Sequence, residues 1–184
     1  MIKVKLQAFL FSVFCILFFV IAGCGYTTRS MITNKYKTIY ITPFVNKIDI
    51  TSQNYVGSQY KVYRPLLETD ITHAVNNKYL FDGNLKPVPK EGADLILKGE
   101  LIDFRRDPLR YTDSDEVAEY RLNLVVNVSL LDNKENKIVW EENGFTGMFT
   151  FFTTGSLAVS ESIAINDAID DLARRIVERT VEQW

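Results

Sequence analysis

The sequence predicts an α/β fold of the two-layer α+β type, in which two helices pack on one face of a four-stranded mixed sheet. Three observations support this class. Residues 118–131 alternate apolar and polar side chains with the period of a strand, whereas segments after residues 65 and 160 have the period of a helix. The elements follow the order β-α-β-β-β-α. The 184 residues less the first 23 leave 161, which suits a single domain over 37–184.

A short strand and a helix are expected in the first half, separated by a long loop over residues 46–63. Residues 38–42 alternate as Thr-Ile-Tyr-Ile-Thr and stop at Pro43, which indicates a strand. The helix is expected to have Pro65 in its first position, where a missing N–H costs nothing, and to end at Gly83 or Asn84. Its buried stripe recurs every fourth residue, at Leu67, Ile71, Val75 and Tyr79.

The second strand is expected over residues 94–104, parallel to the first across a right-handed crossover. Leu95, Leu97 and Leu101 share one face of this strand. The apolar residues then change parity at Ile102 and Phe104, which predicts a bulge or an end that leaves the core.

The third strand, residues 118–131, gives the clearest pattern in the chain. One face carries Tyr120, Leu122, Leu124, Val126, Val128 and Leu130, whereas the other is mostly polar. This alternation predicts a sheet with one covered face. A turn over 132–136 leads to the fourth strand, which ends near Phe152, and Asn143-Gly144 is predicted to be a bulge within it rather than a hairpin turn.

The last helix is expected from about Ser160. Its apolar stripe has the 3.6-residue period. On the opposite side, Asp170 with Arg174 and Asp171 with Arg175 are expected to pair four residues apart. The stripe comprises Ile165, Ile169, Leu172, Ile176 and Thr180.

The amino terminus has the pattern of an export signal. Lys3 and Lys5 precede an apolar run over residues 9–21, and the whole stretch 6–23 is uncharged. A transmembrane helix is the alternative, but this stretch is near the lower limit for crossing a bilayer and no basic stop-transfer cluster follows it. The sequence predicts a signal peptide over 1–23.

The four residues at the end of this signal, Ile-Ala-Gly-Cys at 21–24, resemble the lipobox of bacterial lipoproteins. That resemblance implies cleavage before Cys24, attachment of acyl chains to its sulfur and amino group, and a tether over 24–36. Gly25 in place of Asp is compatible with export to the outer membrane. Because Cys15 would leave with the signal, the mature domain would contain no thiol for a disulfide.

Charge and motif content exclude several functions. Without residues 1–23 the chain has 19 basic and 23 acidic residues, a poor composition for general nucleic-acid binding. His73 is the single histidine, which excludes a two-histidine metal site, and we interpret it as a flanking residue of the first helix. No phosphate loop or nucleophile elbow occurs, and no cofactor is expected. The acidic run Asp113, Asp115, Glu116 and Glu119 is interpreted as a solvated loop.

Four segments resemble one family. Cys-Gly-Tyr at 24–26 looks like its mature start, and Lys-Thr-Ile-Tyr-Ile-Thr-Pro-Phe at 37–44 is similar to its first strand. Ala-Asp-Leu-Ile-Leu-Lys-Gly-Glu at 93–100 is similar to its second strand, and Glu-Tyr-Arg-Leu at 119–122 to its third. In this order, and with the lipobox, the chain resembles the LptE family of lipopolysaccharide-assembly outer-membrane lipoproteins over nearly the whole mature sequence.

The resemblance implies a non-enzymatic function. LptE proteins plug the large outer-membrane β-barrel LptD, help it to fold, and are thought to bind lipopolysaccharide in transit. The expected location is therefore the outer membrane, lipid-anchored, with the domain facing the periplasm or inside the barrel. Two alternatives remain: another outer-membrane lipoprotein that binds peptidoglycan or a different envelope complex, and a lipid-anchored hydrolase with a carboxylate-based site.

Basic residues concentrate in the amino-terminal half. Residues 25–110 carry 13 basic and 9 acidic side chains, whereas residues 111–184 carry 6 and 14. The densest basic segment follows the second strand, and guanidinium groups suit phosphates. The candidate lipopolysaccharide contacts are Lys98, Arg105, Arg106 and Arg110, with a solvated turn as the alternative.

A barrel plug would also need aromatic side chains at its interface. Tyr55, Tyr60 and Tyr63 are candidates for contact with the barrel. The phenylalanines of the fourth strand are further candidates, although at least half of them are expected in the domain's own core. These are Phe145, Phe149, Phe151 and Phe152.

Overall fold

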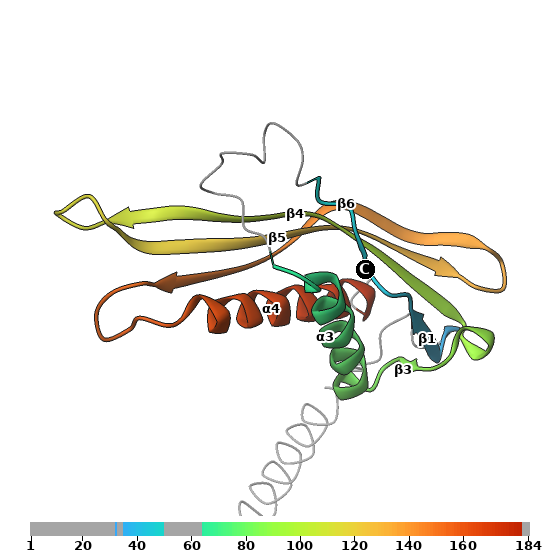
Figure 1. Cartoon of the computed structure of the whole chain (residues 1–184). Coiled ribbons are helices and arrows are strands. Elements are labelled where there is room, and N and C mark those ends of the chain that lie inside the picture. Colours follow the sequence, from blue (N-terminus) through green and yellow to red (C-terminus); the bar gives the residue numbers. More distant parts are fainter. Residues whose placement is uncertain (1–31, 33–34, 50–63, 182–184) are drawn as a thin grey trace, which may run out of the picture.

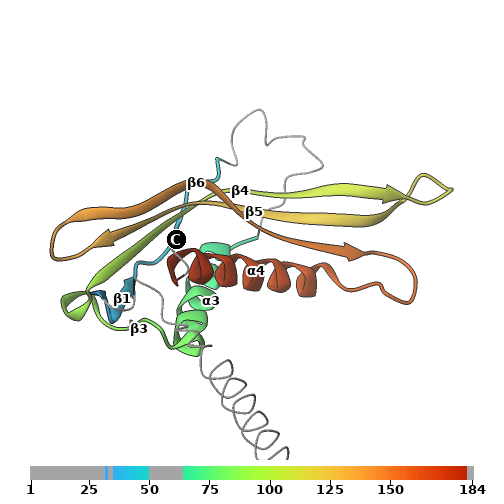
Figure 2. The same ribbon diagram turned by 180° about the vertical axis from the view of Figure 1, so that it is seen from behind.

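The computed structural model describes residues 32, 35–49 and 64–181. The predicted signal peptide at 1–23, Cys24 and the candidate contacts Tyr55, Tyr60 and Tyr63 lie outside the described residues. Three long antiparallel strands form an elongated sheet, and both helices lie on one of its faces (Figures 1 and 2). The two-layer α+β class is therefore confirmed.

The sheet contains six strands rather than the four predicted. β1 (Thr38–Ile41), β4 (Leu95–Tyr111), β5 (Val117–Asp132) and β6 (Lys137–Phe152) correspond to the predicted ones. The additional strands, β2 (Val45–Asn46) and β3 (Lys86–Pro87), have two residues each. The order is β3-β1-β4-β5-β6, with β2 also paired to β4. β1 is parallel to both β3 and β4, whereas β4, β5 and β6 are antiparallel.

A bulge is present in β4, where the sequence left a bulge or a strand end open, and in β6, where a bulge was predicted. The register between β4 and β5 shifts between Leu101 and Asp103, so Ile102 is the extra residue and Phe104 returns to the buried face. In β6, the register shifts opposite Asn127, whose side-chain oxygen accepts a hydrogen bond from the Gly144 N–H at 3.0 Å. Gly144 has φ +73°, which glycine adopts without steric cost, so Asn143-Gly144 is a bulge and not a hairpin turn.

β4 is longer than predicted. The sequence predicted that it ends near Phe104, with the arginines just beyond it, but it continues to Tyr111. Pairing with β5 explains the extension, because Arg105 to Pro108 face Asn123 to Tyr120 in continuous register. The arginines therefore belong to a strand, where successive side chains point to opposite faces.

The helices α3 (Leu67–Asp82) and α4 (Glu161–Val181) cover the sheet with the predicted stripes, and every stripe residue is buried. α3 begins two residues after Pro65, because Leu66 has the left-handed φ of 61° that excludes it from the helix, and Gly83 ends it. Arg175 pairs with Asp171 at 2.8 Å as predicted, but Arg174 contacts Asp171 and Glu178 instead of Asp170.

The described chain begins at the end of the sheet where β5 meets β6. Asp132 is buried there and accepts hydrogen bonds from the Tyr36 hydroxyl at 2.8 Å and from the backbone N–H groups of Lys134 and Glu135. These bonds, with the Lys35 ammonium, hold the pKa of Asp132 well below its ordinary value. This cluster fixes the point at which the chain enters the domain.

Replacing Asp132 with asparagine is expected to lower stability at neutral pH and to weaken its dependence on acid. A carboxyl group whose pKa is depressed on folding stabilises the protein above its unfolded pKa, about 4, and loses that contribution as pH falls below it. The difference in urea midpoint between wild type and Asp132→Asn should therefore be larger at about pH 7 than at about pH 3. Asp113→Asn, on an exposed loop, is the control. An equal difference at both pH values would contradict this role.

Candidate functional site

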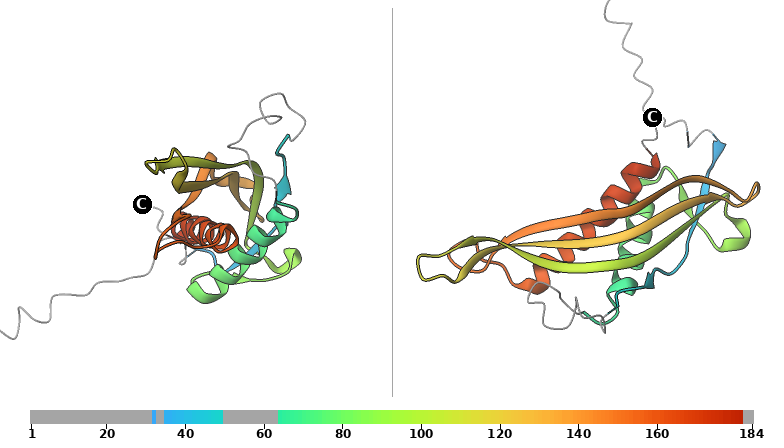
Figure 3. Two further views of the ribbon diagram at one scale, coloured as in Figure 1. Left: turned by 60° about the vertical axis from the view of Figure 1, so that its left-hand side comes forward. Right: turned by 90° about the horizontal axis from the view of Figure 1, so that it is seen from above.

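The face of the sheet opposite the helices is the main candidate surface, because neither helix covers it (Figure 3). We call it the open face. Along β4 it carries Lys98, Glu100, Asp103, Arg105, Asp107 and Arg110, and along β5 Glu119, Arg121, Asn123 and Asn127. Basic and acidic groups alternate, so this face has mixed charge rather than the uniformly basic character that a simple phosphate site would have.

Arg105 lies on the open face within a polar network. Its guanidinium contacts Asp103 at 3.1 Å and Asp107 at 3.2 Å, and the Asn123 amide donates to Asp107 at 2.7 Å. Asn123 is 6% exposed although it faces away from the core. The network holds Arg105 in one geometry and neutralises its charge, so an incoming phosphate would have to share or displace these carboxylates.

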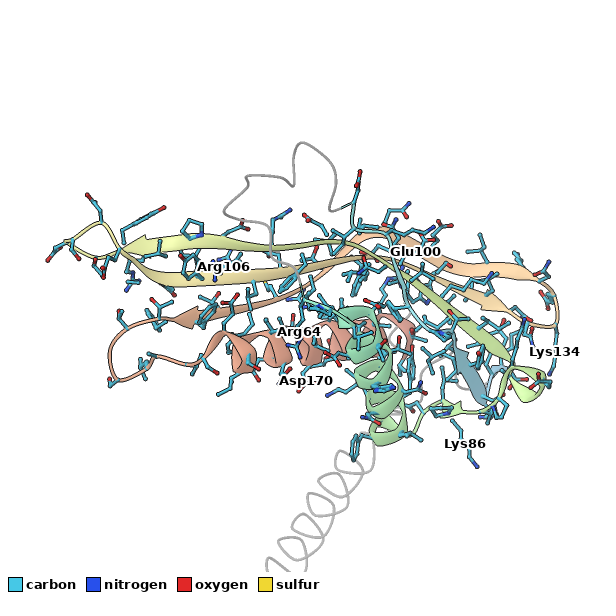
Figure 4. The ribbon with its side chains drawn as sticks, in the orientation of Figure 1. Arg64, Lys86, Glu100, Arg106, Lys134 and Asp170 are labelled. Carbon is cyan, nitrogen blue, oxygen red and sulfur yellow. The ribbon has the colours of Figure 1, made fainter. Side chains whose placement is uncertain are left out.

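Arg106 points to the opposite face, toward α4. Its Nη1 contacts Glu161 in the first turn of α4 at 2.9 Å, and the guanidinium lies 4.7 Å from the centre of the Tyr120 ring. This arrangement connects β4 to the start of α4. Figure 4 shows Arg106 between the sheet and the helix layer. Its contacts are those of a residue that positions α4.

Lys98 and Arg110 lie at different places along the open face. Lys98 lines a cavity of about 240 Å³ with Lys90, Asn133 and Asn136, near the turn between β5 and β6. Arg110 lies near the other end of β4, 3.5 Å from Glu119 and above the Phe152 ring. The four predicted cations are therefore not brought together into one site.

The fourth-strand phenylalanines divide largely as expected. Phe151 is buried and stacks on Tyr120, with ring centres 6.0 Å apart, and Phe145 and Phe149 pack against the core. Phe152 lies on the open face beneath Arg110. At least three of the four thus belong to the domain's own core.

The single histidine and the acidic run lie in exposed positions. His73 is exposed on the flank of α3, and Asp113, Asp115 and Glu116 are exposed in the loop between β4 and β5. Within residues 32, 35–49 and 64–181, no three His, Cys, Asp or Glu side chains gather as a metal site would require. In the same part of the chain, no helix is long and apolar enough to cross a bilayer.

Exposed apolar side chains at two places were missed by the sequence analysis. One group lies at the end of the sheet formed by the β4–β5 hairpin and the β6–α4 connection, which we call the far end. It comprises Leu109, Tyr111, Leu157, Val159 and Ile163. The other is Leu80 and Phe81 at the end of α3, which are 61% and 89% exposed. The α3 pair falls outside the predicted apolar stripe at 67, 71, 75 and 79, which is the signal that could have identified it.

Two solved structures share the fold at low sequence identity, and a third is somewhat less similar. A protein of Xanthomonas campestris has a TM-score of 0.50 and 12% identity over 79% of this chain and 84% of its own. A hypothetical protein of Chlamydia trachomatis has a TM-score of 0.50 and 8% identity over 80% and 99%. Lipoprotein B of Nitrosomonas europaea has a TM-score of 0.49 and 18% identity over 79% and 83%. No curated protein matches the chain.

The solved structures show only a shared fold, whereas a family model identifies the family of this chain. The model described as LptE, lipopolysaccharide-assembly, matches residues 36–180, which include every described strand and nearly all of α4. The match covers well over half of the sequence and contains all four of the cations considered above. The chain therefore belongs to the LptE family of lipopolysaccharide-assembly proteins.

Proposed function

We propose that this chain is an outer-membrane lipoprotein, anchored through acyl chains on Cys24 after removal of residues 1–23, that plugs and helps to assemble an LptD-like β-barrel. In the same complex it binds lipopolysaccharide during transport to the cell surface. The family match and the lipobox support this proposal. The family match also supports a non-catalytic function.

The open face is the observation that carries the plug proposal. The last residue of β4 that pairs with β2 is Leu101. Beyond it, β4, β5 and β6 continue as a three-stranded sheet. Both helices lie on one side of this extension, so the other side is available to a surrounding wall. Its alternating charges and amides can form hydrogen bonds with the polar interior that a wide barrel presents.

The exposed apolar side chains of the far end support a partner as well. Leu157, in the connection between β6 and α4, is 72% exposed, and Tyr111, the last residue of β4, is 54% exposed. Grouped apolar exposure of this kind marks contact surfaces in soluble proteins. We place the barrel contact on the open face and the far end, together with Tyr55, Tyr60 and Tyr63 of the segment that precedes α3 in the sequence.

For lipopolysaccharide, the candidate contacts are Lys98, Arg105 and Arg110 on the open face, with Arg106 acting indirectly by fixing α4. Arg105 and Arg110 are spaced along one strand, as separate phosphates or acidic sugars of a single glycolipid would require. A charge-assisted hydrogen bond to a phosphate contributes about 1.5–3 kcal/mol, so losing one has a measurable effect on affinity.

The double substitution Arg105→Glu/Arg110→Glu is expected to weaken lipopolysaccharide binding by about tenfold or more, because two phosphate partners become repulsive. Binding is measured by titrating the purified full-length protein with fluorescent lipopolysaccharide, and a thermal melt of each variant checks folding. Lys86→Glu is the control, since Lys86 is exposed in β3 and lines neither the cavity at Lys98 nor the network at Arg105. Unchanged binding in a folded double variant would overturn the assignment of these arginines. Failure of the wild type to bind would contradict the function itself.

A further inference from the structure

The far end combines exposed apolar side chains with acidic charge. Its apolar residues lie on two connections, the β4–β5 hairpin and the β6–α4 connection, and each is at least 37% exposed. Grouped apolar side chains that face water indicate that another molecule covers them. The chemistry of that molecule can be inferred from the charges around them.

Hydrogen bonds join the two connections to each other. Tyr111, the last residue of β4, pairs with Val117 across the hairpin. Thr153, the first residue after β6, donates from its hydroxyl to the Val117 carbonyl at 2.7 Å and from its N–H to the Ala118 carbonyl at 3.0 Å. The hairpin and the β6–α4 connection therefore form one end of the molecule (Figures 1 and 2).

The β6–α4 connection has a fixed backbone where its apolar side chains are exposed. The Val159 N–H donates to the Phe152 carbonyl at 3.1 Å, and Ala158 forms a parallel bridge with Phe152. The connection thus folds back onto the end of β6, and Leu157 within it is 72% exposed. Because this backbone is already ordered, a partner that covers Leu157 has little backbone entropy to overcome.

The hairpin holds three exposed carboxylates on one tight turn. The Thr112 N–H donates to the Glu116 carbonyl at 2.7 Å, and the Asp115 N–H donates to the Thr112 carbonyl at 3.1 Å. We call Asp113, Asp115 and Glu116 the tip acids. They make no ion pair with any other residue in the described ranges.

The arginines near the far end do not neutralise the tip acids, because acidic neighbours on the strands and on α4 already balance them. Four arginines face four such acids. The neighbours are Asp103 and Asp107 for Arg105, Glu161 for Arg106, Glu119 for Arg110, and Asp107 across the strand register for Arg121. No Lys or Arg occurs between residues 138 and 173, so β6 and the β6–α4 connection add no positive charge. The far end is therefore net negative.

This charge decides between the two kinds of molecule that cover apolar side chains. A lipid with phosphate headgroups is repelled by the tip acids, whereas a polypeptide with lysine or arginine beside apolar side chains is attracted to them.

We infer that the far end seats a segment of the barrel that carries lysine or arginine next to apolar side chains. Leu157, Val159 and Ile163 pack against the apolar side chains of this segment, and the tip acids pair with its basic groups. The inference rests on the barrel partner proposed above and adds the chemistry of the contact.

The test uses the full chain in its parent bacterium, with an affinity tag after Trp184 and the photoreactive residue benzoylphenylalanine in place of Leu157 or Ser114. Ser114 is exposed between the tip acids. The purified complex is irradiated, and the crosslinked peptides are sequenced by mass spectrometry. We expect both positions to crosslink to peptides of the barrel that contain lysine or arginine within a few residues of the crosslink.

Charge reversal at the tip tests the acidic part of the contact. With the photoreactive residue at Leu157, Asp113→Lys/Glu116→Lys should lower the yield of crosslink by about threefold or more, because attractive pairs become repulsive. The matched control is Glu91→Lys/Asp170→Lys, which makes the same change in charge at exposed positions away from the far end. This control should leave the yield unchanged.

A second pair of variants tests the apolar part. With the photoreactive residue at Ser114, Leu157→Ser/Val159→Ser should lower the yield of crosslink, since one segment contacts both connections. Leu80→Ser/Phe81→Ser is the matched control, because this pair is equally apolar and exposed but lies at the end of α3.

The amount of barrel that co-purifies separates this inference from the proposed function. A barrel that co-purifies without a crosslink from either position, crosslinks to lipid alone, or an equal loss in a matched control would each overturn the inference and leave the plug intact. Absence of a barrel from the eluate would contradict the proposed function, and the inference with it.

Discussion

Replacing Gly147 with alanine is expected to destabilise the domain by about 3 kcal/mol or more, because β6 and α4 are in direct contact at this residue. A Cβ added to Gly147 would lie 2.4 Å from the Leu172 Cβ, 2.7 Å from its Cα and 2.8 Å from its backbone N. Two of these three atoms are helix backbone, so relief requires α4 to move as a unit. Such a movement would disturb the buried stripe that includes Leu172 and Ile176.

Thermal unfolding of the purified full-length protein measures this effect. A loss of about 3 kcal/mol corresponds to a decrease in Tm of roughly 6–12 °C for a protein of this size. Gly92→Ala is the control, because no atom lies within 4 Å of a Cβ added there. If Gly147→Ala melted at the same temperature as Gly92→Ala, the close contact between β6 and α4 would be wrong.

Replacing Cys24 with alanine is expected to abolish lipid attachment and with it stable membrane association. Acyl chains bind a bilayer with about 0.8 kcal/mol per buried methylene, and two or more chains hold a protein almost permanently. Without the thiol there is no site for the first chain, and the signal segment would not be processed as it is in a lipoprotein. Localisation and any function that depends on the membrane would be lost together.

Incorporation of labelled palmitate and the mass of the mature chain measure this loss. Cys15→Ala is a matched control, since Cys15 lies within the apolar run of the same signal. We expect palmitate on the wild type and on Cys15→Ala, and none on Cys24→Ala. Palmitate on Cys24→Ala, or a mature wild-type chain that begins elsewhere than at Cys24, would contradict the lipobox assignment.

The elements that the sequence predicted correctly are those whose pattern is repeated several times. The stripes of α3 and α4 each recur over several turns, and every predicted stripe residue is buried. The alternation in β5 likewise identifies its covered face. A repeated pattern is a strong signal because burial against one core requires an apolar residue at every position of the stripe.

Two short strands and the length of β4 were not predicted, for different physical reasons. β2 and β3 have two residues each, which is too short to show an alternating pattern. They are strands because their backbones pair with β4 and β1, and the local sequence does not indicate this pairing. β4 continues past Phe104 with Arg105 to Arg110, which lack apolar alternation because Arg106 takes the inward position that a leucine would fill. The length of β5 was the available signal, since a hairpin partner must match it.

The prediction of the candidate site was limited in the same way, because it too depended on where β4 ends. The sequence analysis placed Arg105 and Arg106 beyond the end of the strand and treated them as equivalent, whereas the strand directs them to opposite faces. Asn123 illustrates a second limit. It lies on the polar face of β5, yet its hydrogen bond to Asp107 buries it, and only the pairing of the two strands reveals this contact.

Co-purification tests the central claim, that this chain plugs a barrel, most directly. An affinity tag is placed after Trp184, outer membranes of the parent bacterium are extracted in mild detergent, and the bound proteins are identified by mass spectrometry. The proposal predicts a stable, roughly one-to-one complex with a large outer-membrane β-barrel that survives washing at high salt. Recovery of a monomer alone, or of peptidoglycan fragments in place of the barrel, would contradict it.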